Sequence, residues 1–188
     1  MTFLPPPDPA LLTSASAGDL DARARLTRAI APQVLRWCAH LANGRIDAED
    51  AAHDVLVRVL DHLGEIRDPE AFPAWLWRTA SREVFRQIRV ARVRAWIPFP
   101  ASWADDPPAR ERADDDVVRG VRAAIQSLPE KQREVLVLCD LCRYTDDEAA
   151  YLLQVPLGTA KSRLGRARAR FRAEAVERGL CPAREGAK

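Results

Sequence analysis

Little in this sequence points to an enzyme or a membrane protein. Its 188 residues include only three histidines, four cysteines and eight glycines. They form no glycine-rich phosphate loop, no acid–base pair at a useful spacing and no nucleophile–histidine constellation. No apolar run approaches the length of a transmembrane span, and the N-terminal segment MTFLPPPDP lacks the regions of a signal peptide. We therefore expect a cytoplasmic protein with no catalytic site, metal, cofactor or small-molecule substrate.

Aromatic residues are also scarce, at 6% of the chain, whereas alanine, leucine and arginine are abundant, which favours helices over sheet. The net charge of +2 conceals a strong segregation of charge. Residues 47–70 carry eight acidic and two basic side chains, residues 78–94 carry six arginines and one glutamate, and residues 105–116 are again acidic. Alternating blocks of this kind predict several charged surfaces that face different partners.

The cysteines raise the question of metal or redox chemistry. Cys139 and Cys142 form a C-x-x-C pair, a spacing found in zinc and redox sites. A zinc site needs four ligands, and all three histidines lie in the other half of the chain. Because the pair sits in the apolar run VLVLCDLC, we favour reduced core thiols over redox sensing or metal binding.

The most specific pattern is TDDEAAYLLQVPLGTAKSRLGRARARFR, residues 145–172. Thr145 and Glu148 predict a capping box at the start of one helix, and Gln154-Val155 predicts a turn before a second helix with Pro156 at its first position. Apolar residues of the second helix recur at helical spacing and form one predicted buried stripe: Leu157, Ala160, Leu164, Ala167 and Phe171. Two short helices joined by a tight turn indicate a helix-turn-helix.

The polar side of that second helix is strongly basic. Residues 159–178 hold seven basic and two acidic side chains. The residues that we expect to face DNA from this helix are Thr159, Lys161, Ser162, Arg163 and Arg166. Short polar and guanidinium groups can contact base edges, and the later arginines can neutralise phosphates. The alternative is a solvated basic helix of an ordinary bundle, but the paired helices and the turn favour DNA binding.

The acidic block predicts a second kind of surface. Asp47 should cap a helix that runs to about residue 63, with one apolar stripe toward the core. The opposite stripe is acidic with one apolar residue in its middle: Asp50, Asp54, Val57 and Asp61. An exposed valine among carboxylates favours a protein contact, although simple solubility also explains it.

A basic helix is predicted over residues 72–94. Four of its arginines fall on one face at spacings of 4, 4 and 3, together with Trp75: Arg78, Arg82, Arg86 and Arg89. Arginines can hold phosphates and aromatic rings can stack unpaired bases, so this face suits nucleic acid. A tryptophan at helical spacing is more often part of the core, and we favour that role for Trp75 and Trp77.

The rest of the chain predicts an all-α protein of two small helical domains. Helices are expected over residues 8–17 and 19–42, with Pro32 able to kink the second one before it ends at Asn43-Gly44. Residues 97–116, with four prolines and acidic clusters, predict a flexible acidic linker. Two further helices are predicted over residues 117–127 and 129–141, the latter with a capping box formed by Ser127 and Glu130.

Together these segments resemble a known family. The motifs are DAED at residues 47–50, FPAWL at 72–76, LPEKQREVL at 128–136 and PLGTAKSRLGRAR at 156–168. In this order, across an acidic linker, they are similar to those of bacterial RNA polymerase sigma factors of the extracytoplasmic-function type. The resemblance covers about residues 8–96 and 117–175. The chain departs from the family where it has Arg82 and Arg86 in place of a usual asparagine and aspartate, which alters the family's −10 contacts.

The resemblance implies a role for each surface. Residues 1–96 would bind core RNA polymerase through Asp50, Asp54, Val57 and Asp61, and would bind and open the −10 element through Arg78, Arg82, Arg86 and Arg89. Residues 97–116 would be the linker, and residues 117–188 would place the helix-turn-helix in the −35 element. An anti-sigma factor, often membrane-bound, would be a further partner. A stand-alone helix-turn-helix regulator and a thiol redox protein using Cys139 and Cys142 are the alternative hypotheses.

Overall fold

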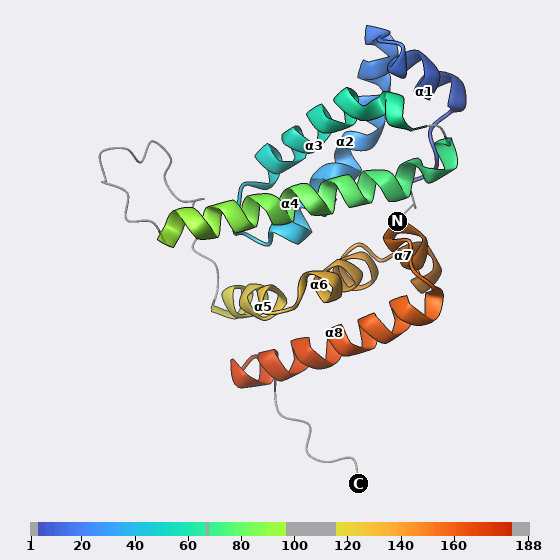
Figure 1. Cartoon of the computed structure of the whole chain (residues 1–188). Coiled ribbons are helices and arrows are strands. Elements are labelled where there is room, and N and C mark those ends of the chain that lie inside the picture. Colours follow the sequence, from blue (N-terminus) through green and yellow to red (C-terminus); the bar gives the residue numbers. More distant parts are fainter. Residues whose placement is uncertain (1–3, 67, 97–115, 182–188) are drawn as a thin grey trace, which may run out of the picture.

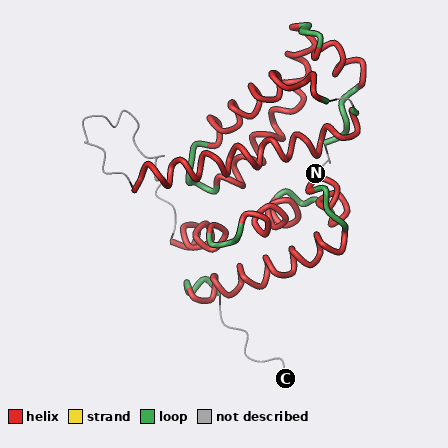
Figure 2. Tube along the Cα trace, in the orientation of Figure 1, coloured by secondary structure: helices red, strands yellow, loops and turns green. Residues whose placement is uncertain are grey.

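The computed structural model describes residues 4–66, 68–96 and 116–181. Within these ranges the regular elements are all helical, as Figures 1 and 2 show. The helices form two groups that are separate in the sequence, four in the N-terminal half and four in the C-terminal half. This confirms the predicted all-α class with two small helical domains. In the described part of the chain, no helix is long and apolar enough to cross a membrane.

The N-terminal domain is built from four helices, three of which begin at an aspartate. The helices are α1 (Pro9–Ser16), α2 (Leu20–Ala42), α3 (Ala48–His62) and α4 (Phe72–Trp96), with single turns η1 (Leu63–Glu65) and η2 (Pro69–Ala71) between the last two. Asp8, Asp19 and Asp47 each accept a hydrogen bond from a backbone N–H of the first turn. A side-chain acceptor there satisfies a donor that has no partner inside the helix, so these caps determine where each helix starts.

Pro32 neither breaks nor ends α2, which continues past it for ten residues to Ala42. Pro32 is exposed, so water can reach the carbonyl group that the missing N–H leaves unbonded. The helix ends where the sequence predicts. Asn43 adopts a left-handed conformation with φ of 50°, and Gly44 follows with φ of 79°.

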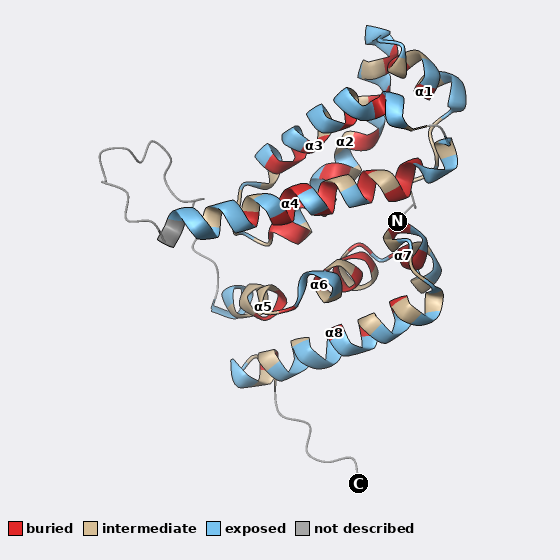
Figure 3. Ribbon diagram, viewed as in Figure 1, coloured by how far each residue is buried: buried red, intermediate tan, exposed pale blue. Residues whose placement is uncertain are grey.

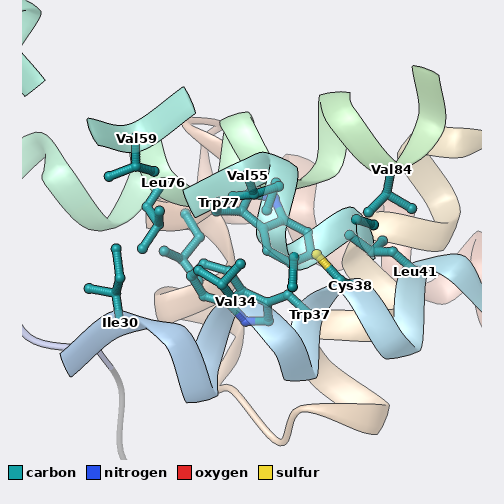
Figure 4. Packing of buried hydrophobic residues seen from close by; sticks show 14 of the residues in the cluster. Ile30, Val34, Trp37, Cys38, Leu41, Val55, Val59, Leu76, Trp77 and Val84 are labelled. Carbon is teal, nitrogen blue, oxygen red and sulfur yellow. The ribbon is translucent and has the colours of Figure 1, made fainter. Parts of the chain in front are cut away.

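Two buried tryptophans lie at the centre of the N-terminal core (Figure 4). Trp37 of α2 and Trp77 of α4 meet edge to face, with ring centroids 5.2 Å apart and an interplanar angle of 88°. Val34, Val55 and Leu76 are buried with them. The predicted core role of Trp77 is therefore confirmed, whereas Trp75 is only half-buried and packs against the edge of this core.

The C-terminal domain has a smaller core of its own. Its elements are α5 (Asp116–Gln126), α6 (Glu130–Leu136), a π-helical turn η4 (Val137–Leu141), α7 (Asp146–Leu153) and α8 (Leu157–Glu177). Six residues of α5, α6 and α8 and of the loop after α5 are buried together: Ile125, Leu128, Val135, Leu136, Leu164 and Ala167. The predicted linker lies outside the described residues except for Asp116, which begins α5.

The predicted capping box of Ser127 and Glu130 is wrong. Pro129 stands at the N-cap of α6, so Glu130 occupies the first helical position and cannot reach back as the third would. The Ser127 hydroxyl instead donates to the Ala124 carbonyl at 2.9 Å. The prediction of one continuous helix over residues 129–141 is also wrong in part. The α-helix α6 ends at Leu136, and the π-helical turn η4 follows it, with the Cys142 N–H donating to the Val137 carbonyl at 2.8 Å.

This π-helical turn joins the two domains. Six residues of η4, α7 and the loop between them are buried in the same cluster as the N-terminal core: Val137, Leu138, Cys142, Tyr144, Ala149 and Leu152. We call this set the interdomain seam. Val135 and Leu136 belong instead to the smaller C-terminal core. The apolar run at residues 135–142 is therefore buried partly against the C-terminal helices and partly against the N-terminal core. Figure 1 shows α4 lying between α3 and the C-terminal helices, with α8 on the far side of α6.

Polar contacts also connect the two domains. The Asn43 side chain donates to the Arg122 carbonyl at 2.8 Å, and Gln126 donates to the Asn43 carbonyl at 3.1 Å. Arg89 of α4 forms an ion pair with Glu130 of α6 at 2.9 Å, and the guanidinium of Arg133 lies 5.6 Å from the centre of the Phe85 ring. The left-handed turn after α2 thus also anchors the second domain.

Candidate nucleic-acid interface

Helices α7 and α8 form the predicted helix-turn-helix. The Thr145 hydroxyl accepts from the Glu148 N–H at 3.3 Å, and a Glu148 carboxylate oxygen accepts from the Thr145 N–H at 2.7 Å. The predicted capping box is therefore confirmed. Gln154, with φ of 53°, ends α7 in a left-handed conformation. Pro156 is the N-cap of α8 and not its first residue as predicted, since the helix begins at Leu157. The turn between the helices is thus fixed at both ends.

The exposed side of α8 begins close to this turn. Ala160, Leu164 and Ala167 are buried, and the predicted stripe is only half-buried at its ends, Leu157 and Phe171. Of the residues predicted to face DNA, Lys161, Ser162 and Arg166 are exposed. The other two, Thr159 and Arg163, are half-buried. Arg166 donates to the Ser162 carbonyl at 3.2 Å, which lays its side chain along this face. The N-terminal half of α8 therefore presents donors toward solvent (Figure 3).

The sequence did not single out Arg168, which fixes α8 in the domain. Its guanidinium makes two bonds to Asp140 of η4, at 3.1 Å and 2.6 Å. The hydrogen bond to Asp140 raises the pKa of Arg168 above its usual value. A two-point bond of this kind sets orientation as well as distance, so Arg168 holds the helix on η4.

All four predicted arginines of α4 are exposed, but they have different neighbours in the folded chain. Arg78 lines a cavity of about 260 Å³ between the domains, opposite Arg163 and Lys131. Arg89 bonds Glu130 across the same boundary. Glu134 also lines this cavity, and burial raises the pKa of its carboxyl group. Arg78 and Arg89 therefore face the C-terminal domain.

Arg82 and Arg86 line a second hollow, a groove of about 290 Å³ beside α4. The groove runs between the end of α3 and the start of α4, and its walls include the half-buried Trp75 with Thr79 and His62. Trp75 is held by the ring of Phe72, with centroids 6.1 Å apart. An aromatic side chain flanked by guanidinium groups can stack an unpaired base while the cations hold its backbone.

A buried carboxylate lies in the same groove. Glu83 is 3% exposed and pairs with two arginines, Arg58 of α3 at 2.9 Å and Arg86 of α4 through Nε at 3.0 and 3.1 Å. The hydrogen bond from Arg86 holds the pKa of this carboxyl below its usual range in spite of burial. No local sequence pattern indicates this pairing, because Arg58 and Glu83 are 25 positions apart on different helices.

The acidic stripe of α3 is exposed as predicted: Asp50, Asp54, Val57 and Asp61. The Val57 side chain is 43% exposed between these carboxylates. Gln87 of α4 donates to Asp54 at 2.9 Å and to Glu83 at 3.1 Å. The outer face of α3 is thus linked through one amide group to the groove on α4.

The thiols of the C-x-x-C pair are poorly placed for reaction. Cys142 is buried in the interdomain seam, and burial raises its pKa to about 12. Burial likewise raises the pKa of the half-buried Cys139 to about 11. Both thiols are protonated near neutral pH and are weak nucleophiles and ligands in that form. In the described ranges, no cluster of three or more metal-ligating side chains occurs.

Comparisons with known proteins agree with this geometry. The families described as Sigma-70 region 2 and Sigma-70, region 4 match residues 26–94 and 119–171. The ECF RNA polymerase sigma factor SigM of Mycobacterium tuberculosis is 31% identical over 164 residues, which cover 87% of this chain and 82% of SigM. The RNA polymerase sigma-H factor of Pseudomonas aeruginosa is 27% identical over 188 residues, 93% of this chain and 94% of that factor.

A solved structure, CnrH in complex with the cytosolic domain of CnrY, shares the fold with a TM-score of 0.61 and 24% identity. The alignment covers 89% of this chain and 96% of that one. The chain belongs to the extracytoplasmic-function (ECF) family of RNA polymerase sigma factors. It is a transcription initiation factor that binds core RNA polymerase and directs it to promoters. The matches thus favour this family over a stand-alone regulator or a thiol redox protein.

Proposed function

We propose that three surfaces divide the work of promoter recognition. Asp50, Asp54, Val57 and Asp61 on α3 dock core polymerase, and the groove at Arg82 and Arg86 holds the opened −10 strand. Thr159, Lys161, Ser162, Arg163 and Arg166 on α8 contact the −35 element. Residues 1–96 and 117–188 are the two functional domains, joined by residues 97–116, and the protein acts in the cytoplasm.

The observation that carries this proposal is the groove on α4. Trp75, Arg82 and Arg86 line one hollow of about 290 Å³, which combines a stacking surface with phosphate-binding cations. The arginines at the usual asparagine and aspartate positions would hold the strand chiefly by charge. Binding of the opened strand should accordingly depend strongly on salt.

Arg78 and Arg89 contribute differently. Both lie toward the C-terminal domain, Arg78 at the interdomain cavity and Arg89 in the pair with Glu130. We propose that they join the −10 contact only after the two domains have separated. All four arginine side chains remain exposed in the folded chain, so the C-terminal domain restricts the approach to Arg78 and Arg89 without burying them.

An anti-sigma factor is a proposed regulator. CnrH was solved with the cytosolic domain of CnrY, and RpoE of Bartonella quintana was solved with the anti-sigma factor NepR. The latter has a TM-score of 0.56 and 21% identity and covers 81% of this chain and 96% of RpoE. The exposed acidic face of α3 offers a surface for which such a regulator and polymerase could compete.

The test is transcription from a promoter with purified core polymerase, together with a chemical probe of unpaired thymines at the −10 element. Arg82→Ala should reduce opening and transcript yield about tenfold or more, while complex formation with core polymerase is retained. Arg25→Ala, at an exposed position on α2, removes the same charge away from the groove and serves as the control. Equal opening by both variants would contradict the proposed −10 role.

Docking is tested on the same preparation. Asp50→Ala with Asp61→Ala should weaken binding to core polymerase, because both carboxylates are exposed on the docking face. Asp21→Ala, on the exposed side of α2, is the matched control. Unchanged affinity in the double variant would remove α3 from the docking surface.

A further inference from the structure

Two carboxylates line the proposed −10 groove, the exposed Glu65 at its end and the buried Glu83 among the arginines. DNA is an anion, and a carboxylate in its path is unfavourable unless that carboxylate is neutralised. Glu83 is 3% exposed, and the two guanidinium groups that pair with it, Arg58 and Arg86, are each 48% exposed. The carboxylate is therefore buried beneath two cations that remain accessible from the groove.

The pairing fixes the direction of both arginines. Glu83 receives Nε and Nη2 of Arg86 and Nε of Arg58, so its two oxygens hold side chains from two helices. Among the bonds of the described residues, Nη1 of Arg86 is not engaged, and that group is left to meet a ligand. A bidentate carboxylate is the partner that best restricts a guanidinium, because the two groups match in geometry.

The network also reaches the proposed polymerase-docking face. Gln87 bonds both Glu83 and Asp54, and Asp54 lies exposed on α3. Arg58 ties the same helix to Glu83 from a second point. The positions of Arg58 and Arg86 thus depend on how α3 and α4 are packed.

We propose that Glu83 is a positioning residue of the −10 groove. It holds the guanidinium groups of Arg58 and Arg86 in fixed orientations, in which they can donate hydrogen bonds to the opened strand, and it restricts the rotation of both side chains. The inference rests on the proposed function of the groove. Glu83 lowers the general attraction for phosphate and raises selectivity, since an oriented guanidinium distinguishes partners that a mobile charge does not.

Glu83→Gln is the principal test, in holoenzyme assembled from the full chain and core polymerase. It removes the charge and keeps the side-chain volume. The affinity for non-promoter DNA should rise. The slope of the logarithm of the binding constant against the logarithm of the salt concentration should become steeper by up to about one released counterion. Discrimination between the preferred −10 sequence and a substituted one should fall about tenfold. A purely structural role would instead lower both affinities together with the melting temperature.

Two further variants keep the test decisive. Arg86→Lys retains the charge but loses the two-point bond, so it should lose discrimination without a change in salt dependence. It also decides the question if Glu83→Gln does not fold. Asp21→Asn is the control for removal of one carboxylate at an exposed site, and it should behave as the wild type.

The outcomes separate this inference from the proposed function. If Arg82→Ala loses −10 opening but Glu83→Gln and Arg86→Lys keep wild-type discrimination and salt dependence, the groove binds DNA and Glu83 is only structural. If Arg82→Ala has no effect on opening, the groove is not the −10 site, and the inference fails with it.

Discussion

The two long arginine-rich helices of this protein are built in different ways. Helix α4 is buried over much of its surface, by the N-terminal core on one side and by the C-terminal domain on another (Figure 3). Helix α8 buries only Ala160, Leu164, Ala167 and Ala175 and is otherwise exposed or half-buried. Arg86 and Arg89 of α4 pair with carboxylates, as Arg168 of α8 does, whereas Arg166 on the outer face of α8 bonds only its own helix within the described residues.

The comparison teaches that similar composition does not give similar behaviour. A substitution in α4 should change folding, domain packing and DNA contact together, since the same helix carries part of the N-terminal core, the boundary with the C-terminal domain and the proposed −10 groove. A substitution on the outer face of α8 should change DNA contact alone. The following predictions test that separation.

The largest effect is expected for Trp77→Ala. Trp77 is 1% exposed, meets Trp37 and lines the interdomain cavity. Loss of its ring should reduce the free energy of unfolding by about 3–5 kcal/mol, as measured by urea denaturation. A loss below 1 kcal/mol would show that α4 does not carry the core in the way described.

Arg166→Ala should separate binding from stability. If Arg166 contacts a base, the loss should cost about 1–3 kcal/mol of holoenzyme binding to the preferred −35 element, with no change in melting temperature. The measurement is a competition assay with −35 variants. Arg172→Ala, exposed near the end of the same helix, should weaken all sequences equally. Equal, sequence-independent losses in both variants would leave Arg166 as a phosphate contact.

Thr145→Ala should affect the helix-turn-helix without touching α4. The variant removes the side-chain oxygen that accepts from Glu148 N–H. We expect a loss of about 1 kcal/mol in unfolding free energy, and faster amide exchange in α7 than in α2. Thr13→Ala is a control, because that exposed hydroxyl bonds only the Pro9 carbonyl within its own helix. Equal losses in the two variants would contradict the capping role.

The smallest effect belongs to the Arg89–Glu130 pair. Both side chains are more than half exposed, at 59% and 52%, and such pairs contribute about 0.2–1 kcal/mol. A double-mutant cycle of Arg89→Ala and Glu130→Ala should give a coupling in this range that disappears at high salt. A larger coupling would mean that charge, rather than the apolar seam, holds α4 to the C-terminal domain.

Local features of the fold were largely predictable from the sequence. Asp47, Thr145 and the Asn43-Gly44 pair set helix ends through bonds with near neighbours, and near neighbours are what sequence patterns record. The capping box at Ser127 fails for a local reason as well, because Pro129 moves the start of the helix. The exposed acidic stripe of α3 follows from its period.

Long-range pairings could not be predicted. Helical periodicity shows that α4 has apolar and basic sides, but it does not show which side meets another domain. The division of Arg78 and Arg89 from Arg82 and Arg86 depends on the seam between η4, α7 and α4. The pairing of Arg58 with Glu83 likewise arises only when α3 and α4 are packed side by side.

The interdomain seam has a consequence for how the protein responds to its ionic surroundings. Its contacts are apolar, from Leu138, Tyr144 and Leu152 against the N-terminal core, and contacts of this kind are little weakened by salt. The arginine contacts to DNA are screened as salt rises. If the domains separate on promoter binding as proposed, an increase in ionic strength should shift the balance from the DNA-bound chain toward the chain with its domains closed, and a fall in ionic strength should shift it back.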